Sequence, residues 1–453
     1  MPDDRYKHRV VIVGGGFAGL GCAQTLADHD DIHVTLIDRN NYHQFQPLLY
    51  QVATSLLSPS DIAHSLREVF AGQDNVDVKL AEISAVDMAT KTVTSTDGGT
   101  WTGDALVLAA GSQPNFFGTP GASDYSFPLY SLDNATNLRS RILGLLEQVD
   151  RNPSLLERGA LNFVIVGGGP TGVEVAGAIA DMIDVTVPTE YHDFKPDDAR
   201  IVLLDHGDAL LKPFSEKAHA YVAKVLTDRK VQLRLGTGVE EVGSGHARFS
   251  DGTVVPTRCV IWGGGISAAP LATNCGLAQG RGGRIDAQPD LTYAGTPGVY
   301  VVGDIANIPG PDGEPLPQLG SVALQSGKTA ADNILAEFEG GPRKRFEYRD
   351  KGIMAMIGRG AAIAEVGKNH HEVHGQLAHA AWLGVHASLM TGTRDKIEAI
   401  IDWSWDRFSK TGGPHVLDRG DAAEINWDDD PTVLSPGAAA AQPAEPQPSQ
   451  TVP

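Results

Sequence analysis

Cysteine and positive charge are both scarce in this sequence. Three of its 453 residues are cysteines, and 36 Lys and Arg face 56 Asp and Glu, for a net charge of −20 at pH 7. Cys22, Cys259 and Cys275 form no C-x-x-C pair, which disfavours a disulfide framework and predicts a reducing, cytosolic environment. The acidic balance excludes nucleic acid as a partner, because the chain has little charge with which to neutralise phosphates.

Long apolar runs are absent as well. No stretch approaches the roughly 18 uninterrupted apolar residues that a membrane-spanning helix needs. The first predicted strand begins near residue 8, with no apolar leader before it, so we expect no secretory signal. A transmembrane protein is therefore not expected, whereas attachment to a membrane surface stays open.

One glycine pattern occurs twice. Residues 10–19 and 163–172 each form an apolar run that enters G-x-G-x-x-G and continues into a predicted helix. In the first copy, Gly14 permits the tight turn, Gly16 lets a pyrophosphate approach the backbone, and Gly19 lets the helix pack closely. A pyrophosphate would then lie at the helix N-terminus. Two copies predict two bound dinucleotides.

An acidic residue follows each copy at the end of the next predicted strand. Asp38 ends the strand at 33–37 and Asp205 ends the strand at 201–204, positions suited to a ribose hydroxyl. No Arg or Lys adjoins Asp205, which favours NADH over NADPH because a carboxylate repels a 2′-phosphate. One such match could be only a glycine-rich turn, but the repeated context favours a genuine site.

The order of the strands predicts how the domains are arranged. Strand and helix patterns alternate from residue 8 to 340, which indicates an α/β fold with parallel sheets. A strand at 299–302 enters Gly303-Asp304 after the second glycine unit is complete. We therefore predict two Rossmann-like domains, the second inserted in the first, with residues 1–118 and 275–345 in one and 119–274 in the other.

The C-terminal part has a different pattern. Short strands are predicted at 346–348 and within 353–366, and two helices within 376–410, separated near Gly392. Residues 346–412 are thus predicted to form an α+β region for membrane association or dimerisation. Residues 413–453 are predicted to be a disordered tail, since 431–453 are rich in Pro, Ala, Gln and Ser.

These motifs resemble the flavoproteins with two dinucleotide-binding folds, in which the N-terminal unit holds FAD and the inserted unit holds NAD(P)H. Residues 299–304 are similar to that family's second FAD motif, which implies that Asp304 reaches the ribityl chain; it could equally be a helix cap. Residues 109–111 resemble the family's A-T-G segment, with Ala110 in place of Thr. The resemblance assigns FAD to Gly14, Gly15, Gly16, Phe17, Ala18, Gly19, Asp38, Arg39, Pro47, Ile83, Ala110, Gly111, Asp304, Val322 and Ala323.

The missing cysteines narrow the chemistry within that superfamily. Relatives that reduce disulfides, peroxides or coenzyme A disulfide carry a redox thiol beside the flavin, and sulfide-oxidising relatives need a late cysteine. The loop at 40–50 has no cysteine and none follows Cys275. Cys22 lies in the first predicted helix, where an inert buried thiol is expected. The flavin must therefore pass its electrons directly to an acceptor.

From residue 8 to 412 the chain resembles the type II NADH:quinone oxidoreductases, most specifically at 41–53, 169–174, 316–327 and 346–352. The resemblance implies FAD-dependent oxidation of NADH with reduction of a membrane quinone, without proton pumping, as part of a respiratory chain. The family's quinone motif A-Q-x-A-x-Q aligns with 320–325, where Gln325 is kept and Ser321 replaces the first glutamine. Gln318 is a possible substitute, and this helix start could instead only pack on the flavin.

Glu174 lies just inside the helix after the second glycine turn. The resemblance places it near nicotinamide and flavin, with a catalytic role shared with Gln325, although an acid in a first turn is often only a partner of the helix dipole. The residues predicted to bind NADH are Gly167, Gly168, Gly169, Pro170, Thr171, Gly172, Glu174, Asp205, Gly264 and Gly265. No histidine or carboxylate spacing predicts a metal site.

The last predicted helix, 394–410, is amphipathic. Ile397, Ile400, Ile401, Trp405 and Phe408 fall on one stripe, and the helix before it is apolar nearly all round. The stripe could pack into a core or a dimer interface. Trp382, Trp403 and Trp405 favour a membrane interface instead, so residues 376–410 are predicted to attach the protein peripherally to the cytoplasmic face of the cell membrane. The family resemblance also implies a homodimer.

Two other functions stay open at this point. One is a soluble NADH-dependent flavin reductase that serves a small redox protein, although such a partner favours a basic docking face that the acidic chain does not indicate. The other is an NADH-binding redox sensor. The C-terminal helices disfavour both.

Overall fold

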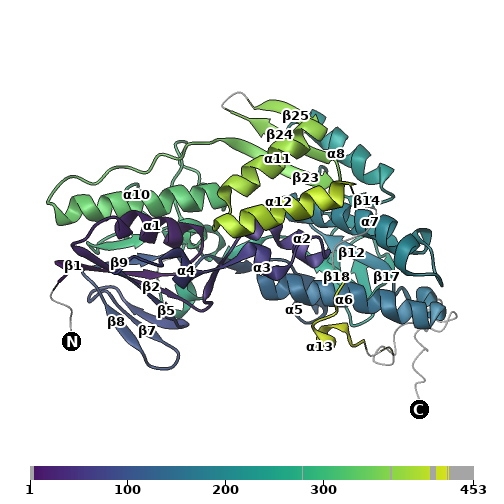
Figure 1. Cartoon of the computed structure of the whole chain (residues 1–453), viewed down its shortest axis with the longest axis horizontal. Helices are drawn as coiled ribbons and strands as arrows, with labels where there is room; N and C mark the ends of the chain where they lie inside the picture. Colours follow the sequence, from purple (N-terminus) through teal and green to yellow (C-terminus); the bar gives the residue numbers. More distant parts are fainter. Residues whose placement is uncertain (1–4, 278, 368–369, 409–414, 426, 428–453) are drawn as a thin grey trace, which may run out of the picture.

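The computed structural model describes residues 5–277, 279–367, 370–408, 415–425 and 427 (Figure 1). The first domain is built on a parallel five-stranded sheet, in which residues 10–13, 105–108 and 299–301 are uninterrupted apolar runs. In spatial order its strands are β21 (Val299–Val301), β9 (Ala105–Leu108), β1 (His8–Val13), β2 (Ile32–Asp38) and β5 (Val76–Leu80). Such uninterrupted apolar runs are typical of strands buried on both faces.

Two helices of this domain, α1 (Phe17–Ala27) and α10 (Gly320–Phe338), lie side by side (Figure 1). Small residues allow the close approach: a Cβ at Gly327 would lie 2.0 Å from the carbonyl oxygen of Ala18. A small antiparallel sheet completes the domain with β6 (Ile83–Asp87), β7 (Thr92–Ser95) and β8 (Thr100–Thr102).

The second domain repeats the first sheet's layout. Its parallel strands are, in order, β11 (Ser126–Pro128), β18 (Cys259–Trp262), β12 (Asn162–Val166), β13 (Arg200–Asp205) and β14 (Gln232–Leu235). Its main helices are α6 (Leu132–Arg151), α7 (Pro170–Glu190) and α8 (Glu216–Asp228), and its small sheet holds β15 (Val239–Val242), β16 (His246–Phe249) and β17 (Val254–Pro256). In both sheets the strand before the glycine turn is central and the strand ending in the acid lies beside it.

The predicted insertion is confirmed by the strand order. β21 follows the whole second sheet in sequence, yet it pairs with β9 of the first sheet. Where the chain crosses between the domains, β10 (Ser112–Pro114) pairs antiparallel with β19 (Ile266–Ala268). The predicted boundaries near 118 and 275 lie just beyond this pair.

A connecting segment with little regular structure lies between the two sheets. It contains β3 (Tyr42–Gln44), the 3-10 turn Gln46–Leu48, α2 (Leu49–Ala53), α3 (Pro59–Ile62), β4 (Ala63–Ser65) and α4 (Leu66–Val69). Its buried side chains, such as Leu48 and Val52, pack into the core of the second domain and of the C-terminal elements. This segment therefore links the first sheet to the rest of the molecule.

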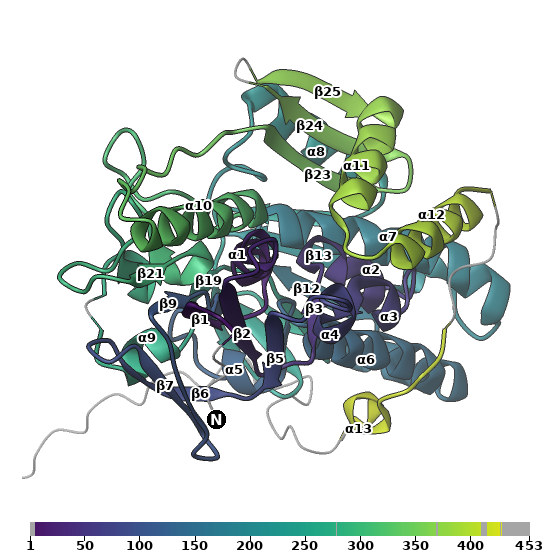
Figure 2. The ribbon, with the colours of Figure 1, turned by 60° about the vertical axis from the view of Figure 1, so that its left-hand side comes forward.

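The C-terminal region comprises an antiparallel sheet of β23 (Gly352–Gly358), β24 (Ala361–Val366) and β25 (His371–Gly375), followed by α11 (Gln376–Leu389) and α12 (Thr393–Phe408). β23 packs on α7, where a Cβ at Gly177 would lie 1.9 Å from the Ile357 carbonyl oxygen. Figures 1 and 2 show α12 above α2 and α3. The predicted strand at 346–348 is wrong: residues 341–351 form neither strand nor helix.

The predicted disordered tail is wrong for residues 415–425 and 427, which pack against α6. They include the short α13 (Gly420–Ala423), which lies on the opposite side of α6 from α2 (Figures 1 and 2). Ala423 fits against Gly144, which has no side chain there, and Asp418 pairs with Arg139. Residues 428–453 lie outside the described residues. Across the described part of the chain, every helix is too short or too polar to span a bilayer.

Candidate functional site: two glycine turns and a cleft

The two glycine turns have nearly the same geometry. Gly14 has φ +106° and Gly167 has φ +107°, values that residues other than glycine rarely adopt. A Cβ at Gly19 would lie 1.8 Å from the Gly14 carbonyl oxygen, and one at Gly172 would lie 1.8 Å from that of Gly167. The close packing of helix on turn, which the spacing predicts, is therefore present in both copies.

The acid after each turn braces it. The two carboxylate oxygens of Asp38 accept hydrogen bonds from the backbone N–H groups of Gly15 and Asn40, both at 2.6 Å. Those of Asp205 accept from Gly168 and Gly207, also at 2.6 Å. Burial raises the pKa of Asp38, although the two backbone hydrogen bonds and Arg39 oppose that rise.

The helices that follow the turns begin without a side-chain cap from any described residue. Gly16 is the N-cap of α1 and Gly169 is the N-cap of α7, and neither helix has an acid in its first turn. A Cβ at either glycine would meet no atom within 4 Å. The unpaired N–H groups of each first turn are therefore open to an anionic ligand.

A cleft of about 790 Å³ runs from the first turn along the ends of β1, β2 and β9. Of the residues predicted for FAD, those on its wall are Gly14, Gly15, Gly16, Phe17, Ala18, Asp38, Arg39, Ala110, Gly111, Asp304 and Ala323. Gly19 and Val322 pack behind the wall, and Pro47 and Ile83 are not among the lining residues.

The remaining wall residues are not assigned to FAD from the sequence, although Ala109 and Gly303 lie within the motifs at 109–111 and 299–304; they are Asn40, Tyr42, Gln44, Gln46, Ala109, Ser112, Tyr130, Gly303 and Gly320. Ser112 Oγ lies 2.7 Å from the Tyr130 hydroxyl and donates to Asp304 Oδ2 at 3.1 Å. Burial raises the pKa of Asp304, while the Ser112 hydrogen bond and the Arg284 charge lower it. Tyr130 follows no glycine motif, so local sequence carries no signal for it.

Histidine 43 supports the cleft from behind. Its Nδ1 lies 2.9 Å from the Gly15 carbonyl oxygen, and its ring meets Phe17 edge to face at 5.1 Å. Burial lowers the pKa of His43, so the ring is neutral at physiological pH and donates to the Gly15 carbonyl. His43, which lies in the segment 41–53 that carries the family resemblance, thus holds the first glycine turn in place.

Glu174 is half-buried in α7, where Oε1 accepts a hydrogen bond from the Met356 backbone N–H at 3.2 Å. Burial raises the pKa of Glu174 to about 8, and the Met356 hydrogen bond only partly opposes this. The carboxyl is therefore largely protonated at pH 7. Burial also raises the pKa of the Tyr50 hydroxyl, and the carboxylate that Glu174 forms at higher pH adds to that rise. A carboxyl such as that of Glu174 is poised to exchange a proton near neutral pH.

The three residues predicted for quinone have partners within the chain. Gln318 donates to the Asp304 carbonyl oxygen at 2.9 Å, which leaves it little freedom to replace the missing glutamine. Gln325 donates to the Arg349 carbonyl oxygen and accepts from the Arg349 N–H, at 3.1 and 3.0 Å. Ser321 Oγ lies 2.9 Å from the Tyr348 hydroxyl.

Comparison with known proteins places the chain in a family. Residues 8–327 match the family described as pyridine nucleotide-disulphide oxidoreductase. Two proteins of Mycobacterium tuberculosis, named type II NADH:quinone oxidoreductases NdhA and Ndh, are each 37% identical, over 91% and 88% of this chain and 89% and 88% of their own length. The chain belongs to the type II NADH:quinone oxidoreductases.

Solved structures agree on the fold. NDH2 from Plasmodium falciparum, solved in complex with NADH, superposes with a TM-score of 0.82 at 18% identity, over 90% of this chain and all of that one. The sulfide:quinone oxidoreductase of Aquifex aeolicus superposes with a TM-score of 0.70 at 16% identity, over 89% and 96% of the two chains.

The thiols of this type II chain are placed away from the cleft. Cys22 and Cys259 are fully buried and do not line it. Burial raises the pKa of the Cys22 thiol, and Asp332 adds to the rise; burial likewise raises that of Cys259, although Arg141 opposes it. These positions fit the expectation that Cys22 is an inert core residue.

The cleft fits FAD, the cofactor that the family uses. The uncapped N-terminus of α1 suits a pyrophosphate, and the bare backbone at Gly16 lets it come close. Asp38 lies beside that turn and Asp304 lies farther along the wall, as an extended dinucleotide requires. Gly320 and Ala323, at the start of α10, form the wall beside Phe17 and Ala18.

Proposed function

We propose that this protein oxidises NADH and reduces a membrane quinone without pumping protons, as part of a respiratory chain. Bound FAD supplies the redox chemistry, since a flavin can take a hydride from NADH and pass two electrons to a quinone. The protein positions the two dinucleotides and controls protons near them. The observation that carries the proposal is the pair of matching glycine turns, one of which opens into a cleft that fits FAD.

The first turn is proposed to hold FAD. Gly14, Gly15 and Gly16 present the backbone to the pyrophosphate, and Phe17 to Gly19 begin the helix behind it. Asp38 faces a ribose, and Asp304 with Ser112 faces the ribityl chain. Arg39, Ala110, Gly111 and Ala323 complete the wall. The cleft wall does not include Pro47, Ile83 and Val322, so a direct contact of these three residues with FAD has less structural support.

The second turn is proposed to hold NADH. Residues 167–172 would bind the pyrophosphate of NADH, and Asp205 would bind its adenosine ribose. Gly264 and Gly265, which have no side chain, would let the nicotinamide end approach the backbone closely. The helix that begins at Gly169 also carries Glu174. We propose that Glu174 orients the nicotinamide and takes up and releases a proton beside the two cofactors. A pKa raised to about 8 favours such exchange near neutral pH.

The test is NADH oxidation by the purified, FAD-loaded protein with a short-chain quinone, measured against ferricyanide and rubredoxin as acceptors, with and without lipid. Quinone-dependent turnover that lipid stimulates supports the proposal. Fast turnover with rubredoxin and none with quinone would identify a soluble reductase of a small redox protein. Tight NADH binding without turnover on any acceptor would identify a redox sensor.

The exposed faces of α11 and α12 are proposed to attach the protein to the cytoplasmic face of the cell membrane. The large apolar side chains that remain exposed there are Leu377, Val385, Leu389, Ile397, Ile400, Ile401 and Trp405. One of them, Ile400, lines a cavity of about 910 Å³ between the two helices, together with Leu383, Ala387 and Trp403 among others. Contiguous apolar patches of this kind mark interaction sites, and a lipid-soluble substrate favours a membrane.

A homodimer is also proposed, and it competes for the same surface. The oligomeric state in detergent, measured by light scattering, distinguishes dimerisation through the exposed faces of α11 and α12 from membrane binding by the same faces. A dimer that dissociates when these helices are made polar would assign the face to dimerisation. A dimer that persists while membrane binding is lost would assign it to lipid.

A further inference from the structure

A strap, defined here as residues 343–349, runs back along α10 without forming strand or helix. Its backbone bonds to side-chain amides of that helix instead. Lys344 donates to Asn333 Oδ1 at 2.7 Å and its carbonyl accepts from Asn333 Nδ2 at 2.9 Å. Arg349 makes the same two bonds with Gln325. Gln325 and Asn333 are about two turns apart, so they lie on one face of the helix.

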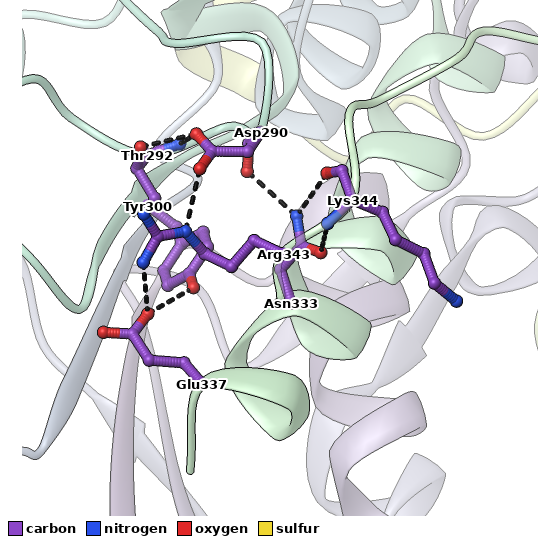
Figure 3. Close-up of polar contacts among 7 residues, drawn as sticks. All are labelled: Asp290, Thr292, Tyr300, Asn333, Glu337, Arg343 and Lys344. Atoms are coloured by element: carbon purple, nitrogen blue, oxygen red, sulfur yellow. Dashed lines mark hydrogen bonds and ion pairs between the residues drawn. The ribbon is translucent and has the colours of Figure 1, made fainter. Parts of the chain in front are cut away.

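The start of the strap is held by a partly exposed polar cluster (Figure 3). Arg343 Nε donates to Asp290 Oδ2 at 2.8 Å, and its guanidinium also pairs with Glu337 at 3.3 Å. Tyr300 donates to the same Glu337 oxygen at 2.7 Å. These contacts come from the loop before β21, from β21 itself and from the end of α10, so the strap is fixed relative to the first sheet.

The strap brings Tyr348 to the first turn of α10. The Tyr348 hydroxyl lies 2.9 Å from Ser321 Oγ. Ser321 is exposed and lies next to Gly320, which lines the cleft together with Ala323. Tyr348 itself is half-buried. The hydroxyl pair therefore lies at the rim of the cleft, next to the part of the wall that Gly320 and Ala323 form.

The hydroxyl pair of Tyr348 and Ser321 keeps one hydrogen-bond donor for a ligand. Two hydroxyls carry two O–H donors, and their mutual hydrogen bond uses one of them. No second partner of either hydroxyl is found within the described residues, so one donor stays available to a ligand. The amide groups of Gln318 and Gln325 each use one of their two N–H donors, but the bonds to the Asp304 carbonyl and to the Arg349 backbone fix the direction in which these amides point.

We propose that Tyr348, paired with Ser321, donates the hydrogen bond to a quinone carbonyl oxygen, in place of the glutamine that Ser321 replaces. This inference rests on the proposed quinone reductase function. A quinone oxygen is an acceptor only, so it matches a free O–H. Gln325 and Asn333 are positioning residues: they hold the strap so that the Tyr348 hydroxyl stays at the rim.

The first test compares Tyr348→Phe and Ser321→Ala with Tyr125→Phe, which removes a hydroxyl from an exposed tyrosine on α5 (Ala122–Tyr125). The measured quantities are KM and kcat for a short-chain quinone, and turnover with ferricyanide, which needs no hydrogen-bond donor. We expect Tyr348→Phe to raise the quinone KM by roughly three- to ten-fold, the usual effect of one lost hydrogen bond, with ferricyanide turnover and the Tyr125→Phe control unchanged.

The second test addresses position. Gln325→Ala should raise the quinone KM much as Tyr348→Phe does, and the double variant should lose little more, because both act through one hydroxyl. An unchanged quinone KM in Tyr348→Phe, or fully additive losses, would overturn the inference. If the wild-type protein oxidises NADH with ferricyanide but not with any quinone, the proposed function itself fails, which is a separate outcome.

Discussion

At the scale of single residues, the two fingerprint acids do more than face a ribose. Asp38 and Asp205 each accept two backbone hydrogen bonds at 2.6 Å. One comes from the glycine turn, and the other comes from the residue two positions after the acid. A charged acceptor strengthens such bonds. Each acid therefore shapes the turn that its ligand meets, and removing it should weaken binding even of the parts of the ligand that it does not touch.

Asp38→Ala and Asp205→Ala should have separable effects. Asp38→Ala should lower FAD affinity by roughly ten-fold or more, because hydrogen bonds to a charged group contribute about 1.5–3 kcal/mol each. Asp205→Ala should raise the KM for NADH by a similar factor while FAD content stays at the wild-type level. Flavin absorbance per protein and steady-state kinetics measure the two effects, and equal loss of flavin in both variants would contradict the assignment.

Glu174 should make stability depend on pH. The folded chain holds this proton up to about pH 8, whereas the ordinary glutamate value is 4.5. Between these values the unfolded state binds fewer protons, so the free energy of unfolding falls as pH rises through this window. Glu174→Gln should remove that fall, on the order of a few kcal/mol. Thermal unfolding of both proteins from pH 5 to 8.5 measures it; parallel curves would contradict the raised pKa.

At the scale of elements, α11 and α12 divide their aromatic residues between inside and outside. Trp382 and Trp403 are buried, whereas Trp405 is 65% exposed. Trp403 Nε1 donates to Gln51 Oε1 at 2.7 Å, and Gln51 Nε2 donates to the Tyr50 hydroxyl at 2.9 Å. Two of the three tryptophans thus dock the helices on α2, and the expectation that all three mark a membrane interface is wrong for those two.

A second polar contact docks the start of α12. His64 Nδ1 lies 2.9 Å from Asp395 Oδ2, and both side chains are largely buried. The backbone of Gly392 lies against the same histidine ring: a Cβ there would approach it within 2.9 Å. With docking contacts at both its start and its middle, α12 presents one fixed face to the outside.

Making that face polar should abolish membrane binding without unfolding the protein. Ile397, Ile401 and Trp405 are 53%, 57% and 65% exposed, so replacing all three by Ser removes little packing. Each contributes on the order of 1 kcal/mol on insertion, so the triple variant should bind phospholipid vesicles at least about ten-fold more weakly. The side chain of Phe408, also predicted for this stripe, lies outside the described residues.

Vesicle flotation measures this binding. A double variant with Ser at Leu80 and Val254 is the matched control, since these exposed apolar side chains lie on β5 and β17 rather than on the two helices. Equal flotation of the triple variant and the wild type would contradict membrane attachment by this face. Equal loss in the control would show a nonspecific effect of surface polarity.

The strap shows how an element can escape sequence analysis. Phe346 and Tyr348 alternate with charged residues, a pattern that favours a strand. The backbone of the strap pairs with no strand among the described residues: its hydrogen-bond partners are the side chains of Asn333 and Gln325 and the carbonyl oxygen of Pro289. Alternation of apolar and charged residues indicates that one side of a segment is buried. It does not indicate which groups form hydrogen bonds with the backbone N–H and C=O groups.

At the scale of the whole molecule, residues 415–425 and 427 tie the C-terminal part of the chain back to the second domain. His415 pairs with Glu190 at the end of α7, and Gln148 of α6 bonds both to the Ala423 carbonyl oxygen and to Trp427 Nε1. The Trp427 ring also lies under the guanidinium of Arg258 at 4.9 Å. The C-terminal region is therefore fastened on both sides of α6.

The two ion pairs of this segment should differ in their contribution to stability, because Arg139 is buried whereas Arg419 is exposed. Asp418→Ala leaves the buried Arg139 without its partly exposed carboxylate and should lower the free energy of unfolding by about 1–3 kcal/mol. Arg419→Ala breaks an exposed pair with Asp133 and should cost less than about 0.5 kcal/mol. Chemical denaturation measures both; equal effects would contradict the packing of this segment on α6.

The sequence alone determined the parts that depend on local backbone geometry. The two turns, the acid after each, the order of the strands and the inserted domain follow from glycine spacing and apolar runs, because a pyrophosphate-binding turn places the same demands on the chain wherever it occurs. The family resemblance, and with it the expected acceptor, also came from contiguous motifs such as 41–53.

Only the tertiary structure decided the contacts between residues far apart in the chain. It brought Tyr130 and Ser112 to the cleft, turned Trp382 and Trp403 inward, bound Gln325 to the strap, and raised the pKa of Glu174 by burying it against β23. Burial, pairing and pKa depend on which elements meet, and that is a property of the packed molecule rather than of any local stretch of residues.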